Sequence, residues 1–93
     1  MFKDLNPLLH SQLRLTIMSH LISKRVSSFN DLKEITKATS GNLSVQLTKL
    51  EAAAYIQLTK SFQKNYPHTA VEITDTGIDA FEEYVKALKD YID

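Results

Sequence analysis

The sequence predicts a single α+β domain, mostly α-helical, that combines a three-helix core, a two-stranded β-hairpin and a C-terminal helix. Its 93 residues are too few for two separate hydrophobic cores, so one domain spans residues 1–93. Apolar residues recur at helical spacing in four segments, and between the third and fourth they alternate with polar residues as in a strand. Only two glycines and two prolines occur, so most of the chain should lie in these regular elements.

The first helix is expected to begin near Pro7, because proline is favoured in a first helical turn, and to end near Ile22. The polar run 24–28 follows it. Its apolar stripe recurs every four residues and consists of Leu9, Leu13, Ile17 and Leu21.

The second helix is expected from about Asn30 to Lys37, with a turn over residues 36–40. Ser28 with Asp31 matches a capping box, which places the start of the helix before Asn30. Asn30 is an equally good N-cap, so both starting points are open.

The third helix should be capped by Thr39 or Ser40 and run from Gly41 to about Ala53. Its buried stripe consists of Leu43, Leu47 and Leu50. The opposite side carries Asn42, Ser44, Val45, Thr48 and Lys49, with Gln46 at its border. Asn, Ser and Thr are poor helix formers, whereas a merely solvated face favours Glu and Lys. This side therefore indicates selection for something besides helicity.

A hairpin is expected over residues 56–73, because the apolar period there changes to two. Its strands cover residues 56–62 and 69–73, and the loop 63–67 between them is polar and partly basic. A last helix over residues 75–92 then starts with Thr74 or Asp75 as its cap. The apolar face of that helix consists of Ile78, Phe81, Tyr84, Val85, Leu88, Tyr91 and Ile92.

This order of elements is that of a winged helix-turn-helix domain. Residues 41–51, followed by Tyr55 and Ile56, look like the recognition helix and first wing strand of MarR- and ArsR-like transcriptional regulators. More closely, the chain resembles a family of small stand-alone winged-helix DNA-binding regulators, in the segments Leu5–Ser11, Leu13–Leu15, Phe29–Leu32, Lys60–Phe62 and Ile73–Gly77. The resemblance implies a winged-helix fold, a homodimer and a role in transcriptional regulation.

The chain departs from the family pattern at several positions. Lys37 and Ala54 stand where the family usually has glycine, which adopts a positive φ without strain. Thr48 stands where arginine is common and Gln46 where histidine is common, and the wing segment 63–68 is less rich in arginine. These changes indicate weaker phosphate binding or a different base preference.

In this architecture the helix 41–53 enters the major groove and the wing 56–73 contacts the backbone or the minor groove. Asn and Gln suit adenine, and Val and Thr methyl groups suit the thymine methyl, which predicts an A/T-rich half-site. Lysines and first-turn N–H groups suit phosphates. The expected DNA-contacting residues are Ser40, Gly41, Asn42, Ser44, Val45, Gln46, Thr48, Lys49, Lys60, Lys64, Asn65 and His68.

Charge is distributed unevenly although the net charge is zero. Residues 1–71 contain nine Lys/Arg and four Asp/Glu (9 − 4 = +5), whereas residues 72–93 contain two and seven (2 − 7 = −5). This distribution suggests that the front of the domain faces a polyanion and that the last helix is held away from it. The alternative is that both regions are ordinary solvated faces, and that Lys60 and Lys64 only deter strand aggregation.

The last helix, 75–92, is also the expected dimerisation helix, because it carries more large apolar residues than one face of a small core readily covers. Ile78 and Phe81 are expected in the core. The expected interface residues are Leu5, Leu8, Leu9, Tyr84, Val85, Leu88, Tyr91 and Ile92. Two-fold symmetry would place two recognition helices roughly 34 Å apart on a palindromic site.

Other chemistry has little support in the sequence. The chain lacks cysteine, His10, His20 and His68 lie on separate elements, and no nucleophile or phosphate-loop motif is visible. The sequence therefore predicts no enzyme activity, metal or cofactor. The N-terminus resembles no signal peptide and no membrane span is present, so a cytoplasmic location is expected.

The resulting hypothesis is a homodimeric DNA-binding transcriptional regulator; repression is favoured, and activation stays open as the alternative. A ligand-sensing repressor with a pocket between the first and last helices is compatible with it, although no effector has a signature in the sequence. The competing hypothesis is a winged-helix module that docks on protein and does not bind DNA. Zero net charge and the missing arginines favour that alternative slightly.

Overall fold

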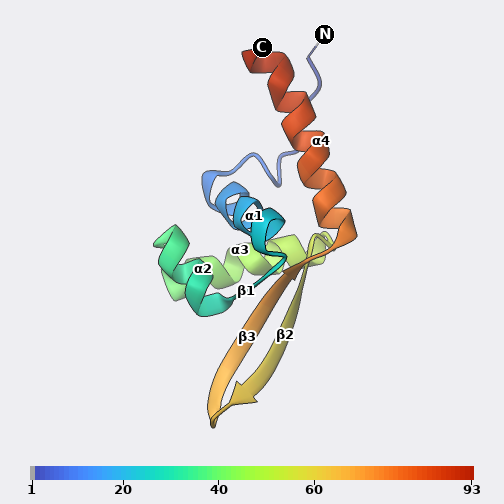
Figure 1. Cartoon of the computed structure of the whole chain (residues 1–93). Coiled ribbons are helices and arrows are strands. Elements are labelled where there is room, and N and C mark those ends of the chain that lie inside the picture. Colours follow the sequence, from blue (N-terminus) through green and yellow to red (C-terminus); the bar gives the residue numbers. More distant parts are fainter. Residues whose placement is uncertain (1) are drawn as a thin grey trace.

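The structure is a computed structural model and describes residues 2–93. Over these residues the chain forms, in order, α1 (Gln12–Lys24), β1 (Val26–Ser28), α2 (Phe29–Thr36), α3 (Ser40–Ala52), β2 (Ile56–Gln63), β3 (Tyr66–Ile73) and α4 (Asp75–Ile92). The strands form one antiparallel sheet in the order β1-β3-β2. Figure 1 shows α1, α2 and α3 grouped around the base of this sheet, with the β2–β3 wing and α4 extending in opposite directions. The predicted winged-helix fold is confirmed.

The hydrophobic core lies where the three helices meet the base of the sheet. Leu43, Leu47 and Leu50 are at most 1% exposed, which confirms the predicted buried stripe of α3. Ile17, Met18 and Leu21 of α1 pack with them, as do Leu32 of α2 and Ile56, Val71 and Ile73 of the sheet. Their packing fixes the side of α3 that faces inward and therefore the side that faces solvent.

The start of α1 differs from the prediction. The amide oxygen of Asn6 accepts the N–H of Leu8 at 2.9 Å, and its carbonyl accepts the N–H of His10 at 2.8 Å, so Pro7 lies in a separate turn. Ser11 then adopts an extended conformation and its hydroxyl accepts the N–H of Arg14. Because Asn6 and Ser11 both bind backbone N–H groups with their side chains, the continuous helix from Pro7 is replaced by a turn followed by a capped helix.

The polar run 24–28, which was expected only to follow the first helix, contains a strand. In β1, Val26, Ser27 and Ser28 pair with Glu72, Val71 and Ala70 of β3, so the two-stranded hairpin becomes a three-stranded sheet. Ser28 then caps α2 by accepting the N–H of Asp31 at 3.0 Å, which decides between the two predicted starts of that helix.

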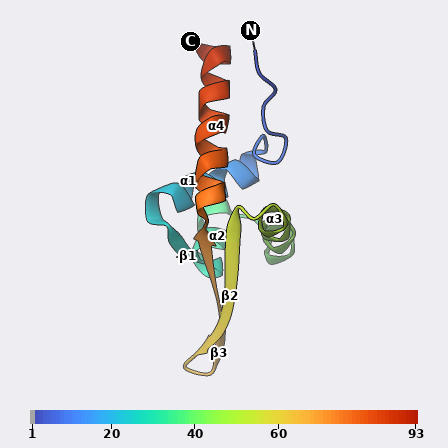
Figure 2. The same ribbon diagram turned by 90° about the vertical axis from the view of Figure 1, so that its right-hand side faces the viewer.

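The wing is longer and its turn tighter than predicted. β2 and β3 each contain eight residues, and they are joined by the two residues Lys64 and Asn65 rather than by a loop over 63–67. Both turn residues have positive φ, 52° and 66°, as a two-residue type I′ hairpin turn requires. Figure 2 shows the resulting wing projecting as a narrow ribbon far beyond the helices.

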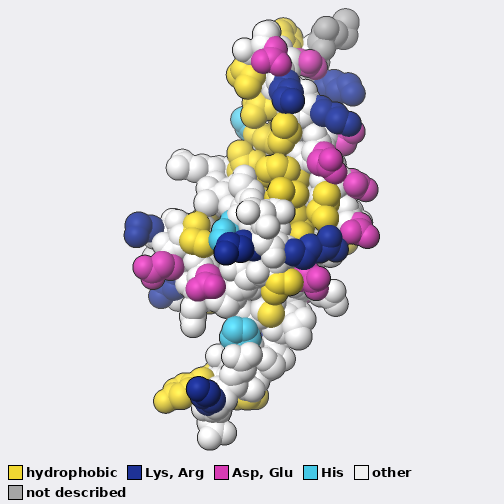
Figure 3. All heavy atoms as spheres, viewed as in Figure 1, with side chains coloured by type: hydrophobic (Ala, Val, Ile, Leu, Met, Phe, Trp, Pro, Cys, Tyr) yellow, Lys and Arg dark blue, Asp and Glu magenta, His cyan; other side chains and the backbone are white. Residues whose placement is uncertain are grey.

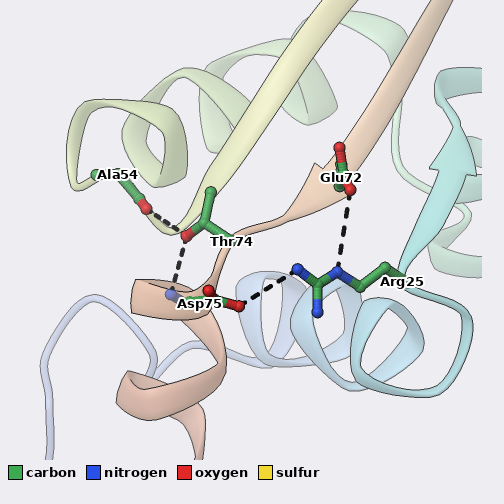
Figure 4. Close-up of polar contacts among 6 residues, drawn as sticks. Arg25, Ala54, Glu72, Thr74 and Asp75 are labelled. Carbon is green, nitrogen blue, oxygen red and sulfur yellow. Dashed lines mark hydrogen bonds and ion pairs between the residues drawn. The ribbon is translucent and has the colours of Figure 1, made fainter.

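Thr74 ties the start of α4 to the end of α3 (Figure 4). Its hydroxyl donates to the carbonyl of Ala54 at 2.5 Å and accepts the N–H of Gly77 at 3.0 Å. Its backbone N–H donates to the carbonyl of Tyr55 at 3.0 Å. Gly77 lies so close to that same carbonyl that a Cβ there would be 2.2 Å from its oxygen, so the chain leaves the sheet and enters α4 at a fixed place.

Arg25 contributes a second, more exposed link at this junction (Figure 4). Its guanidinium lies 3.3 Å from the Asp75 carboxylate and 3.9 Å from that of Glu72. The side chain of Arg25 is about half exposed, so these ion pairs orient the junction but contribute little free energy.

Lys37 and Ala54, where the family resemblance implies glycine, have positive φ, 59° and 63°. Left-handed backbone is strained for any residue with a Cβ. Ala54→Gly is therefore expected to raise the free energy of unfolding by about 1 kcal/mol, as measured by urea denaturation. Ala53→Gly is the matched control: Ala53 has φ −85°, so glycine there should destabilise the protein. Equal effects of the two substitutions would contradict this explanation.

Candidate nucleic-acid interface

The outer face of α3 is exposed within the described chain. The α3 residues predicted to contact DNA, apart from Gln46, are all exposed: Ser40, Gly41, Asn42, Ser44, Val45, Thr48 and Lys49. Val45 at the middle of this face is 51% exposed, although an apolar side chain would gain from burial. Thr39 caps the helix by accepting the N–H of Asn42 at 3.1 Å. The face is therefore held rigidly from behind by the buried leucines and is open in front.

Gln46 is half-buried and belongs to a chain of hydrogen bonds instead of standing free on that face. Its side-chain oxygen accepts a hydrogen bond from the guanidinium of Arg14 in α1, and its amide nitrogen donates to the side-chain oxygen of Asn42 at 3.0 Å. Arg14 also donates to the carbonyl of Leu8 at 2.5 Å. Gln46 therefore positions Asn42, and the expectation that its whole amide is available to pair with adenine needs this correction.

Arg14 was not predicted as part of the interface, because its only sequence signal is a basic residue within an apolar helix. Arg14→Met keeps most of the side-chain length but removes the bonds to Leu8 and Gln46. We expect it to lower the free energy of unfolding by about 2 kcal/mol and to weaken binding to a selected duplex more than to a random one. Paired gel shifts and urea denaturation measure these effects.

Lys24→Met removes the same charge from the exposed last turn of α1 and serves as the control. If the two variants lose affinity equally for both duplexes, Arg14 acts only through its charge.

The base of the wing and α3 enclose a hollow of about 290 Å³. It is lined by Phe29, Ser44, Leu47, Thr48, Leu58, Lys60 and Thr69. The hollow carries hydroxyl groups and one lysine ammonium, which are donors suited to a phosphate.

The predicted wing residues do not all converge on this hollow. The strand register pairs Lys60 with Thr69 on one face and His68 with Ser61 on the other, so Lys60 and His68 point away from each other. Lys64 and Asn65 form the turn at the tip. The wing therefore presents Lys60 toward α3, whereas His68 cannot reach the same backbone segment.

Comparison with known proteins identifies this architecture. Residues 13–92 match the family described as "Winged helix DNA-binding domain". The chain belongs to this family. An uncharacterised protein of Methanocaldococcus jannaschii is 36% identical over 76 residues, covering 82% of this chain and 83% of the relative.

Solved structures of other proteins superpose on this chain and share its fold. A transcriptional regulator homologue from Pyrococcus horikoshii OT3 superposes with a TM-score of 0.86 at 31% identity, over 92% of this chain and 85% of that one. Bordetella bronchiseptica BpsR superposes with a TM-score of 0.75 at 14% identity, over 92% of this chain and 64% of its own, and shows the shared fold only. The protein is therefore a homologue of transcriptional regulators that carries a DNA-binding winged helix.

In this winged-helix domain α4 uses one side to hold the N-terminal segment. Tyr84 is 4% exposed and its hydroxyl is 2.9 Å from Nδ1 of His10. Tyr91 donates to the carbonyl of Lys3 at 2.7 Å, and its ring stacks on Phe2 with centroids 4.7 Å apart. Leu9 is fully buried beneath this segment. Leu9 and Tyr84 are thus core residues, so both must be removed from the predicted dimer interface.

The other side of α4 is apolar and largely uncovered in the single chain. Together with α1 it forms an open groove lined by Ile22, Ile78, Phe81, Glu82, Val85, Lys86 and Lys89. Ile78, Phe81 and Leu88 are half-buried and pack against the core, whereas Ile22 and Ile92 are 40% and 72% exposed. Figure 3 shows hydrophobic side chains forming a column along this end of the molecule. Ile78 and Phe81, which were predicted to be core residues, therefore also contribute to the exposed groove.

None of the helices formed by residues 2–93 combines the length and apolar character that a bilayer crossing needs. Within the same residues, no three His, Asp or Glu side chains form a group that could hold a metal ion.

Proposed function

We propose that this protein is a homodimeric repressor that binds double-stranded DNA with α3 in the major groove, and that it is not an enzyme. The observation that carries the proposal is the open, polar face of α3 opposite its buried leucines. Such a face matches the hydrogen-bonding edges of base pairs, and an α-helix fits the major groove.

The remaining contacts follow from this placement of α3. First-turn N–H groups of the helix, near the exposed Ser40 and Gly41, donate to one phosphate. The lysine and hydroxyl groups of the hollow beside α3 hold the next phosphate along the strand. The wing crosses the DNA backbone toward the minor groove. The acidic α4 extends in the opposite direction from the wing (Figures 1 and 3), so its carboxylates stay away from the phosphates.

The dimer is proposed to form through the groove side of α4. Of the residues predicted for this interface, Leu5, Leu8, Val85, Leu88, Tyr91 and Ile92 retain exposed surface. A domain of this size gains substantial stability when such an apolar stripe is covered by a second copy. The two α3 helices would then reach successive major grooves of a palindrome.

Val85→Glu is expected to convert the dimer to a monomer, because moving a charged carboxylate from water into an apolar interface is costly. Val85 is half-buried and lies outside the core cluster, so the monomer should remain folded. Sedimentation velocity measures the change, and loss of dimer should weaken DNA binding. Thr76→Glu places the same charge on the exposed first turn of α4 and should leave the dimer intact. A dimeric Val85→Glu variant would locate the interface elsewhere.

Selection of genomic fragments by the purified protein, followed by gel shifts at low and high salt, tests the function as a whole. The proposal predicts palindromic A/T-rich fragments whose binding falls steeply as salt rises, because lysines displace counterions from phosphates. Absence of retention on any duplex would contradict it and favour the protein-docking alternative.

A small-molecule effector would shift the equilibrium between free and DNA-bound protein. The DNA binding of BpsR is regulated by 6-hydroxynicotinic acid. In the present chain, a small aromatic acid that bound Lys86 or Lys89 in the apolar groove between α1 and α4 would compete with the proposed dimer contact on that side of α4. Addition of this acid to the gel shift tests whether the protein responds to it.

A further inference from the structure

The tip of the wing carries large exposed aromatic side chains. Phe62 is 78% exposed and Tyr66 is 74% exposed, and Pro67 beside them is also exposed. Figure 3 shows this group as hydrophobic side chains at the far end of the wing, next to a basic one. Such a concentration on a thin hairpin, remote from the core, has no structural role in the folded single chain.

The strand register directs Phe62 and Tyr66 to opposite faces. Phe62 pairs with Pro67 and lies on the same face as the Lys60–Thr69 pair, two residues nearer the core. That face is the one that lines the hollow beside α3. Tyr66 pairs with Gln63 on the other face. Phe62 therefore points to the side on which the proposed DNA lies, and Tyr66 does not.

The chemistry around Phe62 favours a polyanion as its partner. Residues 56–71 contain Lys60, Lys64 and His68 but no Asp or Glu. The wing face is also continuous with the open face of α3 through the hollow between them.

We propose that Phe62 is a wedge that enters the minor groove and partly unstacks one base step, bending the duplex. Apolar side chains inserted from the minor groove act in this way in DNA-bending proteins. Phe62 lies four residues beyond the half-buried Leu58, so the strand carries it about 13 Å past the body. That reach is enough to cross the backbone beside the major groove. This proposal rests on the proposed function, and it adds a second point of contact between the protein and the DNA.

The experiment uses the full chain and a duplex of about 30 base pairs, selected by the protein from a random pool and labelled at both ends. Energy transfer between the end labels measures bending. In a second version of the duplex, the flexible TA step nearest the wing is replaced by AA. The variants are Phe62→Ala, Phe62→Leu and, as the matched control on the opposite face, Tyr66→Ala. Because both aromatics are exposed, all three variants should unfold at the wild-type temperature.

The proposal predicts that Phe62→Ala loses the bend and binds about tenfold more weakly, because an inserted ring stacks on bases. Phe62→Leu and Tyr66→Ala should stay within about threefold of wild type. The TA-to-AA change should weaken the wild type but not Phe62→Ala. If Phe62→Ala bends the duplex as strongly as the wild type does, Phe62 is not a wedge, but the proposed DNA binding still stands. Failure of the wild type to bind any duplex would overturn the proposed function itself.

Discussion

Gly77→Ala is expected to lower the free energy of unfolding by about 3 kcal/mol or more, the upper range for overpacking. A Cβ at this position would lie 2.2 Å from the carbonyl oxygen of Tyr55 and 3.1 Å from Cγ1 of Ile73. The Tyr55 carbonyl cannot move away easily, because it accepts the N–H of Thr74. Relief of the clash must displace α4 from the end of α3, which breaks the capping contacts of Thr74.

Gly41→Ala is the matched control, because a Cβ there meets nothing within 4 Å. Alanine is the better helix former, so this variant should be more stable than wild type by up to about 1 kcal/mol. Thermal unfolding measures both changes. We expect the unfolding temperature to fall by about 15 °C in Gly77→Ala and to rise by a few degrees in Gly41→Ala. If Gly77→Ala unfolds within a degree of wild type, α4 does not sit against Tyr55 as described.

Thr48→Asp is expected to weaken DNA binding by about a hundredfold or more, because like-charge contact across an interface costs several kcal/mol. Thr48 is exposed on α3, and it also lines the hollow where we place a phosphate. Its hydroxyl donates only to the carbonyl of Ser44 in its own helix, at 2.9 Å. The fold should therefore tolerate the change, and fluorescence anisotropy with a labelled duplex isolates the effect on binding.

Thr76→Asp controls for the added charge, since Thr76 is exposed in the first turn of α4 and the acidic side chain is favourable there. It should bind DNA within a few-fold of wild type. Equal weakening by both substitutions would show that net charge, rather than contact by α3, determines affinity.

The elements with strong periodicity and clear caps could be predicted from the sequence. In α3 the leucine spacing, the cap at Thr39 and the polar opposite side all indicate the same orientation, and burial confirms it. The cap of α4 at Thr74 is another local signal that the structure confirms.

The features that depend on distant partners could not be predicted. β1 has only three residues, too few for a visible alternation, and it exists because β3 offers an edge to pair with. Pro7 suggested a helix start, but the hydrogen bonds of Asn6 and Ser11 to nearby N–H groups prevail over that preference. The turn that begins at Asn6 then brings Leu9 into the core.

The interface shows the same division. Exposure of the outer face of α3 followed from the leucine stripe, whereas the link from Arg14 to Gln46 joins residues 32 positions apart and required the helix packing. Tyr84 belongs to an apolar helix face in the sequence, and only its proximity to His10 shows that this face is divided between the core and the open groove.

The central claim, that the open face of α3 binds duplex DNA, is tested most directly by titrating a selected duplex into isotope-labelled protein and following backbone amide resonances. We expect the largest shifts at residues 40–49 and in the wing, with little change along the acidic side of α4. Shifts confined to α4 and the N-terminal segment, with α3 unaffected, would contradict the account.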